Sequence, residues 1–293
     1  MQDGPRLISR MFAAYVALKP KLGRGLGLGL HDRLYRLARR WLDPQRVELD
    51  GFALYLDPYD DVLSYNLARG YPWEEAETRV FRSLLREGMD VLDVGAHIGY
   101  YTLLASRAVG PRGRVFAFEP APGNLALLRK NVSANGCSNV HVVDKAVGAA
   151  CGRSTLLLDP RNTGGHSLGG RSRAAAGALS VEVVDLDGWI EASRARPAVL
   201  KIDVEGGEAA VLEGLRRTLT RAGPLAIMLE LFPERLASSE RSPHAMLELL
   251  VSHRFGLRVI EHGAGPSERL APRRVLELAA ERRLVNLLCE RER

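Results

Sequence analysis

The spacing of apolar residues changes from irregular to regular near residue 80. Beyond that point, short apolar runs alternate with longer segments in which apolar residues recur every three or four positions, the patterns of buried strands and amphipathic helices. This alternation predicts an α/β fold with a Rossmann-like, doubly wound, mostly parallel sheet. The predicted strands are 91–94, 114–118, 140–143, 199–203, 225–231, 257–261 and 285–289, with a helix ending at 109 and further helices at 124–135, 208–219 and 245–253.

The residues before position 80 lie outside this alternation. Residues 46–57 alternate apolar and polar positions and predict a hairpin that turns at Asp50-Gly51. Residues 1–45 predict two helices joined by a glycine-rich loop. We therefore expect a basic helical segment at 1–45, a hairpin and linker at 46–79 in the position of a lid, and a Rossmann-like domain at 80–293. An insertion is expected in that domain at about 154–186, where the alternation is interrupted.

Glycines and carboxylates follow the first two strands of the regular region. The first strand ends in the segment DVGAHIG, in which Gly95 permits a tight turn and Gly99 lets the next helix pack closely. The amides at the start of that helix can hold an anion. The second strand ends in Glu119-Pro120, and Glu119 lies 20 residues past Gly99, the offset at which a carboxylate binds the two hydroxyls of an adenosine ribose. Both segments should meet at the carboxyl edge of the sheet, where ligands bind.

Two details favour S-adenosylmethionine over a dinucleotide. The loop has G-x-x-x-G spacing instead of the G-x-G-x-x-G that brings backbone against a pyrophosphate. It also carries Asp93 just before the first glycine, where a carboxylate repels a diphosphate and suits a ligand with an ammonium and a sulfonium. A nicotinamide-dependent oxidoreductase and a non-catalytic scaffold that binds an adenosine ligand are the alternatives.

Three segments resemble the FkbM-type family of S-adenosylmethionine-dependent O-methyltransferases, which have the class I methyltransferase fold: VLDVGAHIGYYTLLA, GRVFAFEP and VLKIDVEGGEAAVLEGL. The family mostly methylates hydroxyls of sugars, polyketides, related secondary metabolites or glycans and releases S-adenosylhomocysteine. His97 departs from the asparagine that the family usually has in the loop. The resemblance implies that the methionine end is lined by Asp93, Gly95, Ala96, Gly99 and Tyr100, that Glu119 with Pro120 holds the ribose, and that Lys145 and Ala146 flank the adenine.

Candidates for a catalytic base follow the fourth strand and lie in the insertion. A methyl transfer to an alcohol needs the acceptor aligned with the donor and its hydroxyl proton removed. Asp203 and Glu205, at the end of the fourth strand, are candidates, and Asp203 can instead bind the ammonium of the cofactor or cap the next helix. His166 is a third candidate because imidazole titrates near neutral pH, although a solvent-exposed loop histidine is the simpler interpretation. Lys201 shares the strand face of Asp203, in a catalytic arrangement or in a surface salt bridge.

The histidines lack metal-ligand spacing, and we expect no metal, although Asp203, Glu205 and Glu230 offer carboxylates that a divalent ion could use. Three cysteines without a C-x-x-C motif are expected to be buried free thiols. No apolar run is long enough to span a bilayer or to form a secretory signal, which predicts a cytoplasmic protein.

The net charge of +6 is confined to residues 1–45, which hold nine Lys/Arg against three Asp. An excess at one terminus is not the basic stripe of a nucleic-acid groove, so nucleic acid is not expected as a partner. This segment is either a solvated cap on the domain or a peripheral contact with an anionic membrane, carrier or glycan. The expected substrate is a small-molecule or glycan hydroxyl acceptor.

Overall fold

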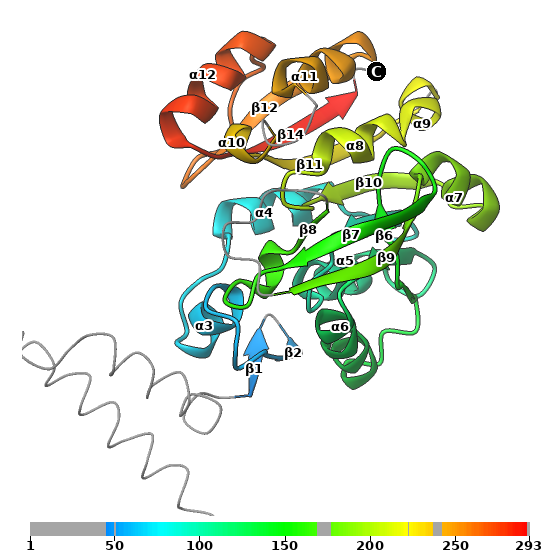
Figure 1. Ribbon diagram of the computed structural model, residues 1–293, viewed down its shortest axis with the longest axis vertical. Coiled ribbons are helices and arrows are strands. Elements are labelled where there is room, and N and C mark those ends of the chain that lie inside the picture. Colours follow the sequence, from blue (N-terminus) through cyan, green and yellow to red (C-terminus); the bar gives the residue numbers. More distant parts are fainter. Residues whose placement is uncertain (1–44, 50, 169–176, 222, 237–241, 292–293) are drawn as a thin grey trace, which may run out of the picture.

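The computed structural model describes residues 45–49, 51–168, 177–221, 223–236 and 242–291. Its centre is an eight-stranded sheet with the order β13-β12-β14-β11-β10-β3-β4-β5 (Figure 1). Strands β5, β4, β3, β10 and β11 are parallel, and β14 inserts antiparallel between β11 and β12. The predicted α/β, doubly wound fold is confirmed. The strands are β3 (Asp90–Val94), β4 (Arg114–Phe118), β5 (Val140–Val143), β10 (Pro197–Ile202), β11 (Ala226–Leu231), β12 (Phe255–Glu261), β13 (Gly265–Pro266) and β14 (Val285–Arg291).

Each face of this sheet packs on its own hydrophobic core. Neighbouring residues of a strand point to opposite faces, so that Val91 enters one core and Leu92 the other. The core with Leu92 lies under the helices of the C-terminal half, and the core with Val91 lies under the helices that precede and follow β3. The helices are α3 (Leu63–Ala68), α4 (Glu75–Leu84), α5 (Tyr100–Val109), α6 (Pro122–Ala134), α7 (Leu186–Ser193), α8 (Glu208–Glu213), α9 (Arg216–Thr220), α10 (Pro233–Leu236), α11 (Pro243–Ser252) and α12 (Pro272–Arg282).

The order of the strands reverses between β3 and β10. From β3 the chain moves outward through β4 to β5, and from β10 it moves the other way to β11. At such a point the loops that follow the two strands separate and leave a crevice at the carboxyl edge of the sheet. The loops after β3 and β10 carry the predicted site residues.

The predicted hairpin is confirmed as β1 (Arg46–Leu49) and β2 (Phe52–Tyr55). The free edge of β2 is paired by side chains from α6. The amide of Asn135 exchanges two hydrogen bonds with the backbone of Ala53, at 2.8 and 2.7 Å, and the amide of Asn131 exchanges two with Tyr55, at 2.7 and 3.1 Å. The two asparagines therefore take the place of a neighbouring strand.

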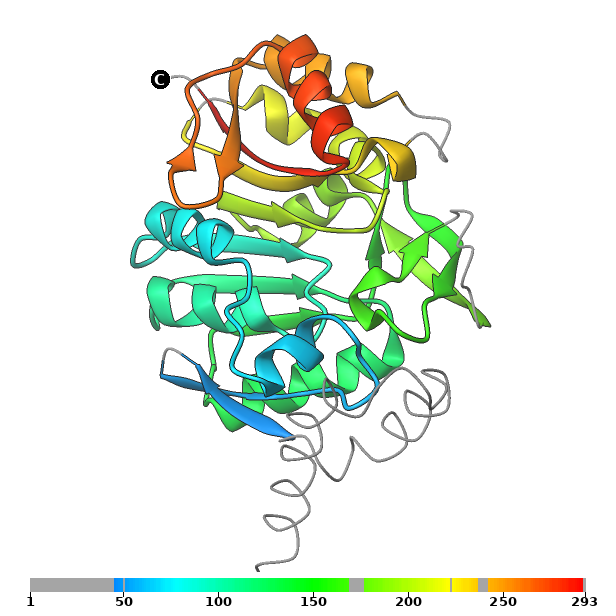
Figure 2. The same cartoon turned by 90° about the vertical axis from the view of Figure 1, so that its left-hand side faces the viewer.

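The stretch expected as an insertion contributes most of a second, four-stranded sheet of order β6-β9-β7-β8. Strands β7 (Gly152–Leu158) and β9 (Gly177–Val184) pair antiparallel along their length, and the short strands β6 (Ala146–Val147) and β8 (Ser167–Leu168) complete it. Figure 2 shows this sheet, in green, beyond the carboxyl ends of the central strands. It therefore forms one wall of the crevice.

The helices predicted within residues 1–45, their basic charge and their proposed docking role lie outside the described residues. Among the described residues, no helix has the length and apolar character needed to cross a bilayer. The three cysteines are free thiols as expected, but only Cys289 is buried, whereas Cys151 is exposed.

Candidate functional site

The loop after β3 is fixed against the loop after β10. Gly95 has φ +86°, and a Cβ at this position would lie 1.8 Å from the carbonyl oxygen of Asp203. The amides of Gly95 and Ala96 donate to the carbonyl of Phe118, at 3.0 and 2.9 Å, and the amide of Asp203 donates to Val94 at 2.9 Å. Residue 95 must therefore be glycine, because both its backbone angle and its neighbour leave no space for a side chain.

Glu119 is a buried carboxylate that joins two loops. Its Oε2 accepts a hydrogen bond from the amide of His97 at 2.9 Å, and its Oε1 accepts one from the amide of Ala121 at 2.8 Å. Burial raises the pKa of Glu119 to about 7, against the lowering effect of these two hydrogen bonds. Each oxygen retains acceptor capacity beyond the bond it already receives, which suits a diol.

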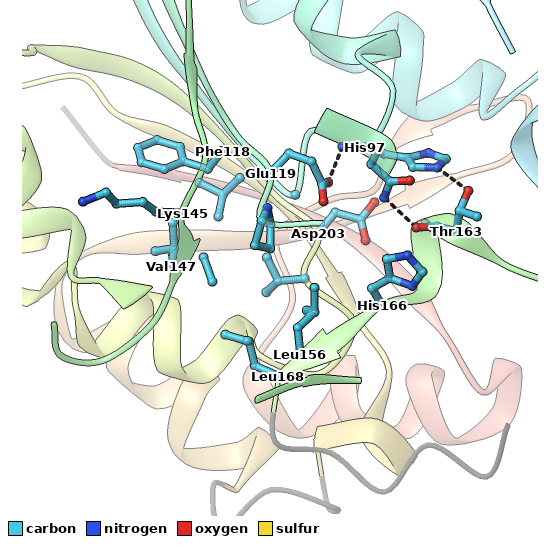
Figure 3. Close-up of a pocket in the computed structure, with 17 residues that line it drawn as sticks. His97, Phe118, Glu119, Lys145, Val147, Leu156, Thr163, His166, Leu168 and Asp203 are labelled. Carbon is cyan, nitrogen blue, oxygen red and sulfur yellow. Dashed lines mark hydrogen bonds between the residues drawn. The ribbon is translucent and has the colours of Figure 1, made fainter. Parts of the chain in front are cut away.

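A pocket of about 490 Å³ opens beside Glu119. Figure 3 shows Glu119 and Asp203 on one side of it and the apolar side chains of Leu156 and Leu168 on another. The predicted residues Pro120, Lys145 and Ala146 line it, together with Phe118 and Val147. The pocket thus combines a hydrogen-bonding end with an apolar end, as a nucleoside requires, and we call it the nucleoside pocket.

A second, larger pocket of about 910 Å³ adjoins the first, and we call it the polar pocket. The two pockets share Gly95, His97, Gly164 and Asp203 in their walls. The polar pocket is rich in ionisable side chains from segments far apart in sequence. Besides His97 and Asp203, they are Glu74, Asp93, Tyr100, Tyr101, Lys201, Glu205, Glu230 and Arg235. The predicted residues Asp93, Ala96 and Tyr100 therefore line the polar pocket, while Gly99 starts α5 behind them with φ +99°.

Lys201 and Asp203 form an ion pair in the polar pocket, in which Lys201 is buried and Asp203 partly exposed. The ammonium of Lys201 lies 2.7 Å from Asp203 Oδ2 and 4.5 Å from the centre of the Tyr101 ring, and the residue is only 6% exposed. Burial acts to lower the pKa of Lys201, but the carboxylates of Asp203, Glu74 and Asp93 outweigh it and raise this pKa. The surface salt bridge considered for Lys201 is therefore wrong.

The other carboxylates in and beside the polar pocket differ in their partners and in their pKa values. Burial, followed by the charges of Asp203 and Glu208, raises the pKa of Glu230 well above its usual range. Glu205 has φ +56° and forms an ion pair with Arg235 of α10. The turn before α8 is held by Glu208 Oε1, which accepts from the amides of Val204 and Gly206. Helix α8 has no side-chain cap, so the capping role considered for Asp203 is wrong.

His166 lies in the nucleoside pocket, away from the polar pocket. Its Nδ1 accepts a hydrogen bond from the amide of Asp159 at 3.0 Å, and burial lowers its pKa, so the ring is neutral. The three candidates for a catalytic base therefore lie in different places. His166 lines the nucleoside pocket, Glu205 lines the polar pocket, and Asp203 lines both.

Sequence reasoning missed how the segment 159–168, which we call the strap, is fastened across the site. His97 Nε2 lies 2.8 Å from Thr163 Oγ1, and Asn124 donates to the Thr163 carbonyl at 2.8 Å. The amide of Asp61, in the linker before α3, donates to the carbonyl of Arg161 at 2.7 Å. The unusual histidine of the glycine loop therefore binds the strap, and its departure from the family pattern was the only signal.

Sequence reasoning also missed Glu74. Its side chain enters the polar pocket and accepts a hydrogen bond from the Tyr101 hydroxyl at 2.5 Å. Among the described residues, no group of three or more histidine, cysteine, aspartate or glutamate side chains has an arrangement that could hold a metal ion.

A mostly parallel sheet with one antiparallel strand inserted between β11 and β12, a glycine loop after β3 and a buried carboxylate after β4 is the arrangement of a Rossmann-like methyltransferase of class I. Residues 93–259, more than half of the chain, match the methyltransferase FkbM domain, and the chain belongs to this family. The resemblance to this family that the motifs indicated is confirmed. The prediction that the cofactor is S-adenosylmethionine is confirmed with it. Family membership decides against the nicotinamide-dependent oxidoreductase.

The chain is 30% identical over 148 residues to the hexuronic acid methyltransferase AglP of Haloferax volcanii, covering 49% of this chain and 58% of that protein. It is 26% identical over 144 residues to methyltransferase 1 of Beauveria bassiana, covering 43% and 57%. The chain thus spans less than two thirds of these curated relatives. Among solved structures it is similar to the FkbM methyltransferase of Methylobacillus flagellatus, at 18% identity and a TM-score of 0.46, over 74% of this chain and 48% of that one.

The residues present fit S-adenosylmethionine. Asp93 is 1% exposed, and its Oδ1 has no hydrogen-bond partner although Oδ2 accepts from Thr102 at 2.6 Å. An unpaired buried carboxylate oxygen is costly and suits a ligand that carries a positive charge. At the other end, Glu119 and the apolar wall suit a ribose and an adenine.

Proposed function

We propose that this chain methylates a hydroxyl of a sugar, glycan or secondary metabolite. The observation that carries the proposal is the pair of adjoining pockets, one suited to a nucleoside and one polar, whose shared wall contains Gly95 and Asp203. The likeness to a hexuronic acid methyltransferase supports a sugar acceptor. Hydroxyl-rich acceptors need hydrogen-bond acceptors in their site, and the polar pocket supplies several carboxylates.

The nucleoside pocket provides the cofactor's binding energy and orientation. Glu119 accepts hydrogen bonds from the ribose, and Pro120, Lys145 and Ala146 flank the adenine. The methionine end lies against Asp93, Gly95, Ala96 and Tyr100, and Gly99 caps the helix α5 that carries Tyr100. When bound, S-adenosylmethionine supplies a methyl group that is already activated by its sulfonium.

Asp203 is the candidate base that the geometry favours. It lines both pockets, so its carboxylate can receive the proton of an acceptor hydroxyl placed beside the methionine end. The ammonium of Lys201, 2.7 Å away, balances its charge. Glu205, paired with Arg235, orients the acceptor from the far wall, and His166 borders the cofactor.

The test begins with calorimetric binding of S-adenosylhomocysteine, followed by transfer from S-adenosylmethionine labelled in its methyl group to glycosides of hexoses and hexuronic acids. Transfer that yields methyl ethers supports the proposal. Label that appears in esters or amines contradicts O-methylation of a hydroxyl, and cofactor binding without transfer to any hydroxylated acceptor favours the scaffold.

The role of Asp203 is tested by Asp203→Asn, with Asp144→Asn at an exposed surface pair as the matched control. We expect Asp203→Asn to lower kcat at least a hundredfold while the affinity for S-adenosylhomocysteine changes little. Equal losses in both quantities would reassign Asp203 to cofactor binding.

A further inference from the structure

Glu74 lies outside the residues matched by the family domain, yet its side chain enters the polar pocket. It precedes α4, in the linker between the hairpin and the Rossmann-like domain. Its Oε2 accepts a hydrogen bond from the hydroxyl of Tyr101, a residue of α5 directly after the glycine loop. Glu74 is therefore held against the element that starts the cofactor site.

The backbone at Glu74 is in an unfavourable conformation. It has φ +43° and ψ +53°, the left-handed region that a glutamate seldom adopts. The conformation is maintained because the Glu74 carbonyl accepts from the amide of Thr78 at 2.7 Å, while the side chain is held by Tyr101. Strain of this kind persists where the surroundings impose it and is concentrated at functional sites.

The charges around Glu74 do not balance. Glu74, Asp93 and Asp203 face a single ammonium, that of Lys201, whose close contact is with Asp203. Arg235, the other cation of this pocket among the described residues, is paired with Glu205. Burial raises the pKa values of both Glu74 and Asp93, which reflects the cost of charging them without a further cation.

One buried carboxylate oxygen in the wall of this pocket has no hydrogen-bond partner among the described residues. This atom is Oδ1 of Asp93. Asp93 and Glu74 both line this pocket beside Gly95 and Ala96, where the amino-acid end of the cofactor is proposed to lie. That end of S-adenosylmethionine carries an ammonium group. This group is positively charged and can donate hydrogen bonds to both carboxylates.

We propose that Glu74 is a cofactor-binding residue whose carboxylate, together with Asp93 Oδ1, receives the ammonium group of the methionine end of S-adenosylmethionine. The inference rests on the proposed function, because it requires this cofactor. It extends the cofactor site to the linker before α4, so that cofactor binding and the position of the linker are coupled.

The test compares S-adenosylhomocysteine with its deaminated analogue, in which hydrogen replaces the amino group, by calorimetry with competition. In the unchanged chain we expect the deaminated analogue to bind at least tenfold more weakly, the effect of losing a charge-assisted hydrogen bond. In Glu74→Gln this ratio of dissociation constants should shrink about three- to tenfold, because only the ligand with the ammonium loses a partner, and Asp93 should keep the ratio above one. Glu75→Gln, at the exposed neighbouring position, should keep the original ratio.

Tyr101→Phe removes the hydroxyl that orients Glu74 while keeping both charges. We expect a smaller decrease of the ratio, about two- to fivefold, and this variant replaces Glu74→Gln if the latter does not fold. An unchanged ratio in the foldable variant, or an equal loss for both ligands, overturns the role of Glu74. Failure of the unchanged chain to bind S-adenosylhomocysteine overturns the proposed cofactor itself and is a separate result.

Discussion

Gly95→Ala tests the close approach of the two loops at the centre of the site. The added Cβ would lie 1.8 Å from the Asp203 carbonyl oxygen and 2.9 Å from its carbonyl carbon, where an unstrained C···O contact is about 3.3–3.6 Å. The loops would have to separate by more than about 1 Å, although the amide of Asp203 is bonded to Val94. The left-handed backbone costs about 1–2 kcal/mol and the overpacking about 1–3 kcal/mol or more, so we expect a loss of roughly 3–5 kcal/mol in the free energy of unfolding.

Substitutions at two other glycines distinguish the cost of the left-handed backbone from the cost of overpacking. Gly88 has φ +81° and open space around it, so Gly88→Ala reports the backbone term alone, about 1–2 kcal/mol. Gly99→Ala places its Cβ 2.7 Å from the end of the Leu128 side chain, which can move, and should fall between the two. Urea unfolding of the three variants gives the order. A Gly95→Ala variant no less stable than Gly88→Ala would refute the close approach.

Three further predictions concern cofactor binding and the need for a metal ion. Because burial raises the pKa of Glu119 to about 7, the carboxylate that accepts the ribose hydroxyls forms as pH rises from about 6 to 8, and the affinity for S-adenosylhomocysteine should rise over this window. Calorimetry should find that rise absent in Glu119→Gln, and an identical slope in both proteins would assign the titration to another group. His97→Ala removes the contact with Thr163 and should weaken S-adenosylhomocysteine binding about two- to tenfold, the net value of one hydrogen bond, so that an unchanged dissociation constant would show that the strap does not depend on it. Methyl transfer should proceed unchanged in a chelator, and activity that is lost there and restored by magnesium would contradict this.

The parts of the site that follow buried strands could be predicted from the sequence. Gly95, Glu119 and Asp203 come directly after apolar runs, and the carboxyl ends of parallel strands necessarily meet at one edge of a sheet. The apolar runs also predict the central strands apart from the two-residue strand β13, because each run is bounded by turn residues. These residues could be placed in the site because their position at the end of a strand can be read from the neighbouring sequence alone.

The parts that depend on packing between distant segments could not be predicted. Glu74 is a polar residue before an amphipathic helix, and only the docking of that helix on α5 brings it into the polar pocket. Lys201 alternates with apolar neighbours like an exposed residue, but it is buried in the fold, with its ammonium 4.5 Å from the centre of the Tyr101 ring of α5. The antiparallel pair of β7 and β9 in the insertion was not predicted either, because two strands can be matched to one another only when the fold brings them together.

The asparagine pairing of strand β2 bears on the order in which the chain folds. A two-stranded hairpin of four-residue strands has little stability of its own. Its outer edge is satisfied by Asn131 and Asn135, some 80 positions later in the chain, so the hairpin must wait for α6 to reach its place beside the sheet. The β1–β2 hairpin, although synthesised before α6, is therefore expected to acquire protection from hydrogen exchange only after the β3–α6 unit has formed, and until then its unpaired edge is open to other chains.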